Sequence, residues 1–399
     1  MKDLIDWRML LKRFSLLSLF ILSTSCTVIA SEEYLSKTKQ DILKYSYDKA
    51  IEDSSKLKND WINPITYKYI YSNTENYDTQ KSIISISQPI FKSGGIYYAI
   101  KYANSIKNQT NIGIDVQKKE LIKQTINLLF QIKKIDITIS KQKLLIKNAK
   151  LDVVRKQEQV LNGILDTSFL DNSILDANSK QNTLIDLNYQ KTTLVNNLSK
   201  LSDKQYTQMQ LPVLELVTND TYINNNIYIQ KANDTIKTSY WLKNMTSANY
   251  LPTVNATADY TKYHDTDDNT ALNDETTNYG FNITIPLDIK YSNTIQSAKI
   301  DYLQKKSELE DIKQAEKVLL DNSTAKIESL SKKILIAKSD IELYESLVTQ
   351  IKEQLDVGMK TQSDLKTIEN SRNIKVLEIQ SLKIDKQIEL LEIYSRIQS

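Results

Sequence analysis

Residues 250–261 read YLPTVNATADYT, and residues 281–288 read FNITIPLD. In both stretches apolar and polar residues alternate one by one, and in the second stretch the pattern runs through Ile285 and Leu287. Alternation with a period of two is typical of a β-strand with one apolar and one polar face. The two stretches therefore predict a β-hairpin, and residues 264–278 between them predict a long, polar, acidic loop.

A long helical run follows this hairpin, from Asn293 to Leu355. It contains no proline, and its apolar residues recur at spacings of three and four, as in an amphipathic helix. At 1.5 Å per residue such a run makes a rod of roughly 90–100 Å, which no compact domain can hold. Gly358 predicts a helix C-cap and a tight turn, after which a second helix returns from Leu365 to Ile397.

The first half of the chain repeats this plan. Its first predicted strand has an apolar face made of Trp61, Ile65, Tyr67, Tyr69 and Tyr71. Gln88-Pro89-Ile90-Phe91 corresponds to Ile285-Pro286-Leu287, and Asn162-Gly163-Ile164 corresponds to Val357-Gly358-Met359 at nearly the same spacing. Such internal similarity indicates one structural unit used twice. We therefore expect a first repeat over residues 31–210 and a second over residues 211–399.

The remaining predicted helices are Lys37–Lys58, Ile96–Leu161, Leu170–Leu201 and Tyr222–Ala248. Gly94 and Gly95 stand between a predicted strand and a predicted helix, which indicates a bend. The glycine and lysine spacing of a phosphate-binding loop is absent around them.

Residues 1–30 read as an export signal, with basic residues before an apolar run that starts at Phe14. Met9 is an alternative start, because the segment that follows it contains every part of such a signal. Cys26 is the only cysteine of the chain, and it is either removed with the signal or retained as a lipid-bearing N-terminus.

Composition argues against an enzyme. The 399 residues include only 6 glycines and 5 prolines, which favours long uninterrupted elements over a loop-rich catalytic fold. The net charge of +3 is too small to indicate nucleic-acid binding. His264 is the only histidine, so neither a His-based triad nor a multi-His metal site can form. We expect no catalytic residue, no cofactor and no bound metal.

The predicted strands also imply several copies of the chain. Four strands cannot close a barrel, and an open strand edge in lipid leaves backbone donors and acceptors unsatisfied at several kcal/mol each. Since the smallest membrane barrels have about 8 strands, at least two copies must combine. A closed ring of identical subunits is the usual solution, but the residues alone do not choose its size.

The chain resembles TolC-type outer-membrane efflux proteins over residues 35–397. The similarity rests on Ala248-Asn249-Tyr250-Leu251-Pro252-Thr253 before a strand, on Gln88 to Gly95 before a helix, and on Val357-Gly358 followed by Ser363-Asp364-Leu365. The resemblance implies a mainly α fold with β-hairpins, in which duplicated long helical hairpins form an α-barrel. It also implies a homotrimer whose four strands per chain build a 12-stranded transmembrane β-barrel.

The resemblance further implies the location, the partners and the site residues. It places the chain in the cell outer membrane, extending into the periplasm, as a duct for efflux or type I secretion. A periplasmic adaptor protein and an inner-membrane transporter are the implied partners, and the exported substrate is left open. The implied adaptor contacts are Asn162, Gly163, Ile164, Leu170, Val357, Gly358, Met359 and Leu365. The implied periplasmic aperture comprises Asp364, Lys360 and Phe169.

The roles of two aperture residues, Asp364 and Phe169, have alternative interpretations. Identical Asp364 carboxylates gathered around a symmetry axis would raise one another's pKa and could hold cations. An acid in the first turn of a helix that stabilises the helix dipole is the simpler interpretation of Asp364. Phe169 stands where an aspartate is common in the family, which puts a paired gate network in doubt.

Two other classes of protein fit parts of the sequence. A periplasmic coiled-coil adaptor or scaffold would also contain helical hairpins, but one hairpin and a compact β-rich domain would be expected instead of a duplication. A peripheral lipoprotein would require Cys26 to survive as the mature N-terminus.

Overall fold

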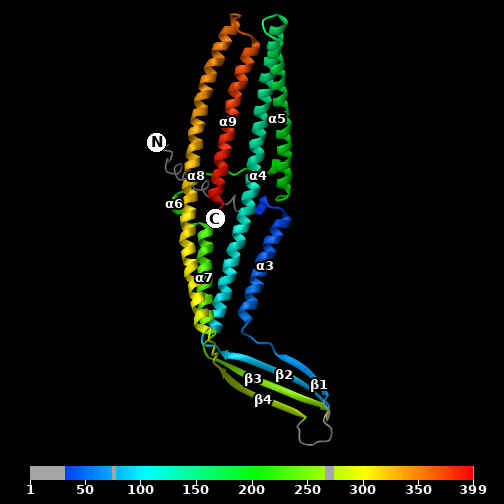
Figure 1. Ribbon diagram of the computed structural model, residues 1–399, viewed down its shortest axis with the longest axis vertical. Coiled ribbons are helices and arrows are strands. Elements are labelled where there is room, and N and C mark those ends of the chain that lie inside the picture. The colour runs from blue at the N-terminus through cyan, green and yellow to red at the C-terminus, as the bar shows by residue number, and fades with distance from the viewer. Residues whose placement is uncertain (1–31, 74–77, 266–273, 399) are drawn as a thin grey trace, which may run out of the picture. The chain divides into compact units, whose positions relative to one another are not determined.

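The computed structural model describes residues 32–73, 78–265 and 274–398 of the chain (Figure 1). The predicted signal segment 1–30, with Met9 and Cys26, lies outside these ranges. With the labels of Figure 1, the elements are η1 (Glu32–Tyr34), α3 (Lys37–Asn59), β1 (Thr66–Asn73), β2 (Asp78–Phe91), α4 (Gly95–Leu161), α5 (Thr167–Ser199), η2 (Tyr206–Gln208), α6 (Asn219–Asn224), α7 (Ile227–Ala248), β3 (Thr253–Asp265), β4 (Glu275–Thr284), α8 (Tyr291–Asp356) and α9 (Gln362–Tyr394).

The chain is mainly helical with one four-stranded sheet, which confirms the predicted fold class of the single chain. An order of helix, two strands, long helix and shorter helix occurs twice, first as α3, β1, β2, α4 and α5, then as α7, β3, β4, α8 and α9. The division into repeats at residues 31–210 and 211–399 stays a prediction.

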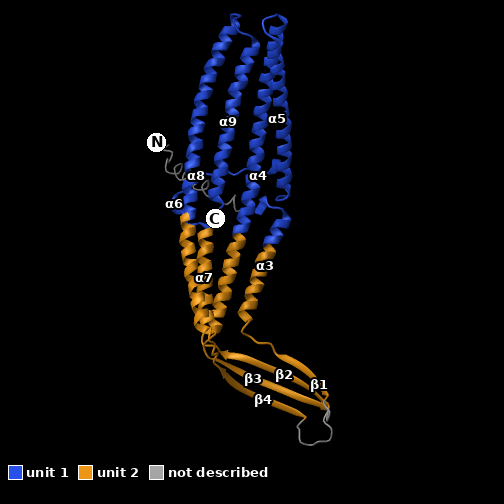
Figure 2. Ribbon diagram, viewed as in Figure 1, with its two compact units in different colours: residues 1–43, 116–226, 315–399 blue, residues 44–115, 227–314 orange. Residues whose placement is uncertain are grey.

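Two compact units each combine segments from both halves of the chain (Figure 2). Unit 1 comprises residues 1–43, 116–226 and 315–399, and unit 2 comprises residues 44–115 and 227–314.

The long helices α4 and α8 contain 67 and 66 residues. The sequence permits this length because no proline lies between Pro89 and Pro212 or after Pro286. Both helices match their predicted ranges to within two residues at each end. Before α4, Ser93 and Gly94 have φ values of 44° and 83°, which confirms the predicted bend between strand and helix.

In unit 1 the helices lie in the order α5, α4, α9, α8 (Figure 1). Gln142 of α4 donates to the Lys180 carbonyl of α5 over 2.8 Å, and Asn370 of α9 donates to Asn148 of α4 over 2.7 Å. Lys375 of α9 pairs with Asp340 of α8 at 3.0 Å.

Apolar residues spaced by three and four form the core of unit 1. Its fully buried side chains include Ile122, Ile126, Ile132, Leu390, Leu391 and Ile393. Burial of each such side chain contributes about 1.5–3 kcal/mol relative to exposure. The amphipathic pattern of the sequence therefore accounts for the packing of α4 against α9.

In unit 2 the helical segments lie in the order α3, α4, α7, α8. Ser54 of α3 donates to the Ala103 carbonyl of α4 over 3.0 Å. Gln109 of α4 donates to Thr235 of α7 over 3.2 Å. Aromatic rings connect α7 to α8, since the ring centroids of Tyr240 and Tyr302 are 5.8 Å apart.

The sheet of unit 2 is antiparallel in the order β1-β2-β3-β4, so β1 and β4 are its edges. Its register places apolar and aromatic residues of all four strands on one face. That face comprises Tyr67, Tyr69, Tyr71, Ile84, Ile86, Val254, Ala256, Ala258, Tyr260, Tyr279, Phe281 and Ile283. The opposite face is mostly polar, with residues such as Lys68, Asn255 and Asn282.

The strands are shorter at the prolines than the alternation predicts. β1 begins at Thr66, so Trp61 and Ile65 precede it, and β4 ends at Thr284, so Ile285 and Leu287 follow it. Pro64 and Pro286 lie just outside these ends. Proline has no N–H group to donate to a strand ladder, which accounts for the end of pairing at these two sites. Pro89 is tolerated inside β2, where the register against β3 shifts between Pro89 and Phe91.

The predicted loop between the second pair of strands is also too long. β3 continues to Asp265 and β4 already begins at Glu275. Lys262 pairs with Glu275 at 3.4 Å, and the His264 ring contacts Ser82 at 2.7 Å, so neighbouring strands hold these polar residues. Residues 266–273 of this loop, and residues 74–77 between β1 and β2, lie outside the described ranges.

The predicted helix Tyr222–Ala248 is wrong as one element, because it divides into α6 and α7 at Asn225 and Asn226. The backbone at this break pairs with the C-terminal segment. Asn226 forms an isolated bridge with Ile397, and Gln398 donates to the Asn225 carbonyl over 2.7 Å. A tertiary contact thus competes with the local helical pattern.

Candidate functional site: two helical turns and a buried polar network

Every residue of the predicted site lies in the α4–α5 or α8–α9 turn or in the first turn of the helix that follows it, and both regions belong to unit 1. Gly163 and Gly358 have φ values of 69° and 76°, in the left-handed region that favours glycine. Their roles as turn glycines are therefore confirmed.

Each turn satisfies helix carbonyls in the same way. The Gly163 and Ile164 N–H groups donate to the Val160 and Gln159 carbonyls over 3.0 and 2.9 Å. In the second turn Gly358 and Met359 donate to Leu355 and Gln354 over 3.0 and 2.8 Å. This pair of bonds defines a Schellman motif, which ends a helix and reverses the chain.

The turns expose apolar side chains to solvent. Ile164, Val357 and Met359 are 70%, 70% and 74% exposed. Asn162 is also exposed, whereas Leu170 is half-buried and Leu365 is buried. The exposed part of the predicted adaptor contact is therefore the turn itself, and Leu365 supports it from within unit 1.

Asp364 begins α9 as one half of a capping box. The Thr361 hydroxyl accepts from the Asp364 N–H over 3.2 Å, and Asp364 Oδ2 accepts from the Thr361 N–H over 3.1 Å. These bonds satisfy two backbone donors that a helix start leaves free. Asp364 also accepts from Arg155 Nη1 of α4 at 3.3 Å, so it connects two helices of unit 1.

The pKa of Asp364 in the single chain lies below its usual value. Hydrogen bonds from the Thr361 backbone and side chain are the main causes of the lower pKa. Burial opposes them, and the nearby charges of Lys360 and Arg155 add to the lowering. This direction is opposite to the one expected for carboxylates gathered around a symmetry axis, because other carboxylates are not part of the single chain. Lys360 itself is exposed beside the turn.

The α4–α5 turn is built differently. Asp166 is the N-cap of α5 and accepts from the Ser168 N–H over 2.8 Å. The side chain and the backbone N–H of Ser168 together lower the pKa of Asp166. Phe169 stands three residues after this cap and is 52% exposed. Phe169 therefore takes the position in the first turn that Asp364 takes in the second.

Sequence reasoning missed three residues in or near these turns. Thr361 and Asp166 could have been found, since a Thr or Asp just before a helical run is a helix-start signal. Arg155 could not have been found this way, because it lies 209 residues from its partner Asp364.

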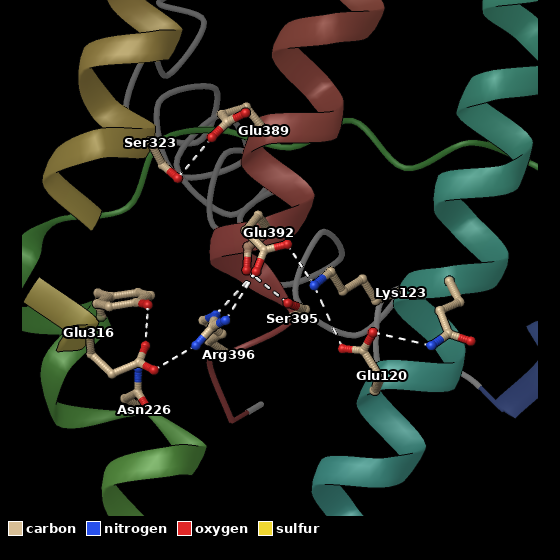
Figure 3. Close-up of polar contacts among 11 residues, drawn as sticks. Glu120, Lys123, Asn226, Glu316, Ser323, Glu389, Glu392, Ser395 and Arg396 are labelled. Carbon is tan, nitrogen blue, oxygen red and sulfur yellow. Dashed lines mark hydrogen bonds and ion pairs between the residues drawn. The ribbon is translucent and has the colours of Figure 1, made fainter. Parts of the chain in front are cut away.

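A second polar region of unit 1 lies deep among α4, α6, α8 and α9 (Figure 3). Glu316 is only 5% exposed, and its carboxylate accepts three hydrogen bonds. It accepts from the Tyr222 hydroxyl at 2.6 Å, from Asn226 Nδ2 at 2.8 Å and from Arg396 Nη1 at 2.6 Å. Buried charge is tolerated only when it is paired and hydrogen-bonded in this way.

The network continues from Arg396 to α4 (Figure 3). Arg396 Nη2 pairs with Glu392 at 3.2 Å, and Lys123 Nζ pairs with the other oxygen of Glu392 at 2.6 Å. Burial opposes ionisation of Glu392, but the bonds and charges of Lys123 and Arg396 outweigh it and lower its pKa. Burial and the Glu316 carboxylate raise the pKa of Tyr222. The network therefore fastens the C-terminal segment to three helices of unit 1.

Within residues 32–73, 78–265 and 274–398, no three His, Cys, Asp or Glu side chains gather as metal ligands would. None of the helices described there combines the length and apolar character needed to cross a membrane.

The duplicated helical hairpins and the four-stranded sheet together are the fold of TolC-type outer-membrane channels, as the resemblance implied. The chain is similar to the outer-membrane protein VceC of Vibrio cholerae, with a TM-score of 0.74, 12% identity, and coverage of 94% of this chain and 96% of that one.

Two other solved structures are comparable. The outer-membrane channel CmeC of Campylobacter jejuni gives a TM-score of 0.74 at 13% identity, over 93% of this chain and 85% of that one. The open state of the outer-membrane channel MtrE of Neisseria gonorrhoeae gives 0.65 at 11% identity, over 94% and 88%. No protein-family model and no curated protein sequence matches the chain. At these identities the similarity shows the fold.

Proposed function

We propose that copies of this chain assemble in the outer membrane into a duct that carries substrates out of the cell, in efflux or in type I secretion. The observation that carries the proposal is the two-faced sheet of unit 2. Phe281 and Ile283 of its apolar face are 75% and 63% exposed, so this face covers no core in the single chain. An apolar face toward lipid and a polar face toward a lumen are the pattern of membrane β-structure.

The free edges of the sheet support assembly into a ring. Because four antiparallel strands alternate in direction, β1 and β4 run in opposite senses. The β4 edge of one copy can therefore pair with the β1 edge of the next copy in the same antiparallel manner. Repetition of this contact closes a barrel without an open edge, and the channel fold favours a homotrimer of twelve strands.

The helical turns of unit 1 are the proposed docking site for a periplasmic adaptor protein, which would connect the duct to an inner-membrane transporter. Exposed Ile164, Val357 and Met359 supply the apolar contact that such a partner would bury. Asp364, Lys360 and Phe169 stand beside these turns as the proposed periplasmic aperture. The capping box orients Asp364, so a charge at this position is held in a defined geometry.

Planar-bilayer recording of protein purified from outer membranes in mild detergent tests the duct. We expect discrete conductance steps, and Asp364→Ala should weaken block by multivalent cations while the steps remain. A preparation that never conducts overturns the duct and favours a periplasmic adaptor or scaffold.

A matched pair of variants tests the docking site. Joint substitution of Ile164, Val357 and Met359 by serine should abolish export in cells while conductance in bilayers persists. The control variant has serine in place of Leu335, Ile336 and Leu343 of α8, which are 63%, 65% and 61% exposed. This variant should export normally. Equal export by both variants contradicts the docking site.

A further inference from the structure

Five aromatic rings cluster in unit 2 where α4, α7 and α8 approach the sheet. Tyr97 and Tyr98 open α4, Tyr240 and Trp241 lie near the end of α7, and Tyr302 lies early in α8. Ring centroids of Tyr240 and Trp241 are 5.0 Å apart, and those of Tyr240 and Tyr302 are 5.8 Å apart. Trp241 also contacts Tyr97 at 6.1 Å and Tyr98 at 6.3 Å, so the rings form one continuous group.

Three lysines lie against the faces of these rings. Lys243 is 4.9 Å from the Tyr240 centroid, Lys306 is 5.2 Å from that of Tyr302, and Lys101 is 5.4 Å from that of Tyr97. Among the described residues, none of these three ammonium groups has a carboxylate within ion-pair distance. Contact with a ring face holds the cation in place but does not neutralise its charge.

The surrounding sequence concentrates positive charge. Residues 92–107, 237–250 and 288–306 contain nine lysines and two acidic residues, although the whole chain carries a net charge of +3. Two of these lysines, Lys237 and Lys305, pair with Asp234 and Glu308 just outside the segments. The rings are accessible as well, since Tyr97 is 54% exposed and Tyr240 is 39% exposed. The cluster thus combines amphipathic aromatics with cations that lack acidic partners among the described residues.

We propose that this cluster binds the headgroups of anionic phospholipids at the inner surface of the outer membrane. The inference rests on the proposed function, which places the sheet in the hydrocarbon layer and therefore the adjoining helix ends at headgroup depth. Tyrosine and tryptophan favour that depth because one end of each ring is apolar and the other is polar. Lysines there attract phosphate groups, and the long lysine side chain lets the ammonium reach them.

Trp241 gives the cluster an intrinsic reporter. In the full chain with Trp7→Phe and Trp61→Phe it is the only tryptophan. We would add phosphatidylglycerol or phosphatidylcholine, each brominated near the ester end of its acyl chains, to the detergent-solubilised protein and record quenching of Trp241 fluorescence. We expect phosphatidylglycerol to quench at several-fold lower mole fraction than phosphatidylcholine.

A matched pair of triple variants locates this preference. Lys101→Gln, Lys243→Gln and Lys306→Gln together should remove most of the preference, so that the two lipids quench Trp241 at mole fractions within about twofold of each other. The control, Lys150→Gln, Lys333→Gln and Lys338→Gln, removes the same charge from exposed sites in unit 1 and should keep it. The inference is overturned if the two lipids quench Trp241 equally in the protein with all its lysines, or if the first triple variant keeps the preference unchanged.

Two further measurements distinguish a lipid site from a soluble-anion site, and failure of this inference from failure of the proposed function. A change in Trp241 emission on addition of inorganic phosphate to lipid-free protein would assign the cluster to a soluble anion and overturn the lipid inference. Bilayer conductance is recorded on the same preparation. Conductance without lipid preference defeats this inference alone, whereas absence of conductance defeats the proposed function beneath it.

Discussion

At the scale of single residues, Gly163 and Gly358 differ from Gly113 in backbone conformation alone. A Cβ atom built on any of the three meets nothing within 4 Å, but only the two turn glycines have positive φ. We predict that Gly163→Ala and Gly358→Ala each lower the free energy of unfolding by about 1 kcal/mol. Gly113→Ala, inside α4, should raise it by about 0.5–1 kcal/mol, since alanine favours a helix interior. Urea titrations compare the three, and similar losses at all positions would contradict the turn assignment.

The buried polar network around Glu316 predicts a larger change in the free energy of unfolding. Arg396→Ala leaves Glu316 buried without its cationic partner, which should lower the free energy of unfolding by about 3–5 kcal/mol. Lys332→Ala is the control, because its pair with Glu328 has side chains 71% and 66% exposed. An exposed pair contributes about 0–1 kcal/mol. Thermal unfolding followed by circular dichroism tests both variants, and a small effect of Arg396→Ala would show that the network contributes little.

Single residues also mark the limit of sequence reasoning. The turn glycines could be predicted because a helix C-cap leaves a local signal. The partners of Glu316 could not, since Arg396 lies 80 residues away and the pairing exists only after the helices pack. The burial of Leu365 beside an exposed turn likewise depends on the neighbouring helices.

At the scale of elements, the capping box of α9 predicts a dependence on pH. The folded-state pKa of Asp364 is lowered, so its stabilisation is present above the unfolded value of about 3.9 and is lost as pH falls through the folded value. As pH falls below about 4, amides in the first turn of α9 should lose hydrogen-exchange protection worth about 0.5–1 kcal/mol. Asp364→Asn should remove most of this dependence, and Asp311→Asn on α8 should not. Identical pH profiles in all three proteins would contradict the role of the cap.

Elements were predictable wherever local pattern and packing agree. The helices α4 and α8 follow from an uninterrupted period and the absence of proline, and β3 follows from clean alternation. The break between α6 and α7 could not be predicted from the local pattern, because Asn226 leaves the helix to contact Glu316 and Ile397. To predict where β1 begins and β4 ends, the missing N–H groups of Pro64 and Pro286 would have had to outweigh the alternation that continues past them.

At the scale of the whole molecule, the sheet of one chain is incomplete. Both edges are open in the single chain, and the apolar face has no core to cover. The sequence predicted this need for further copies because four strands cannot close. It could not supply the contact between copies, which depends on the register of one edge against another.

Cross-linking of the two sheet edges tests the assembly most directly. Cysteine at Tyr67, Tyr69 or Tyr71 of β1 is combined with cysteine at Tyr279 of β4, and the protein is oxidised in isolated outer membranes. Cys26 is the only native cysteine, so the unsubstituted chain and the single-cysteine variants serve as controls. Disulfides require Cα atoms about 4.4–6.8 Å apart, and they will form between copies only if β1 and β4 are neighbours. We predict a ladder of linked chains that ends at three, whereas chains that stay unlinked in every combination would contradict the shared barrel and the duct with it.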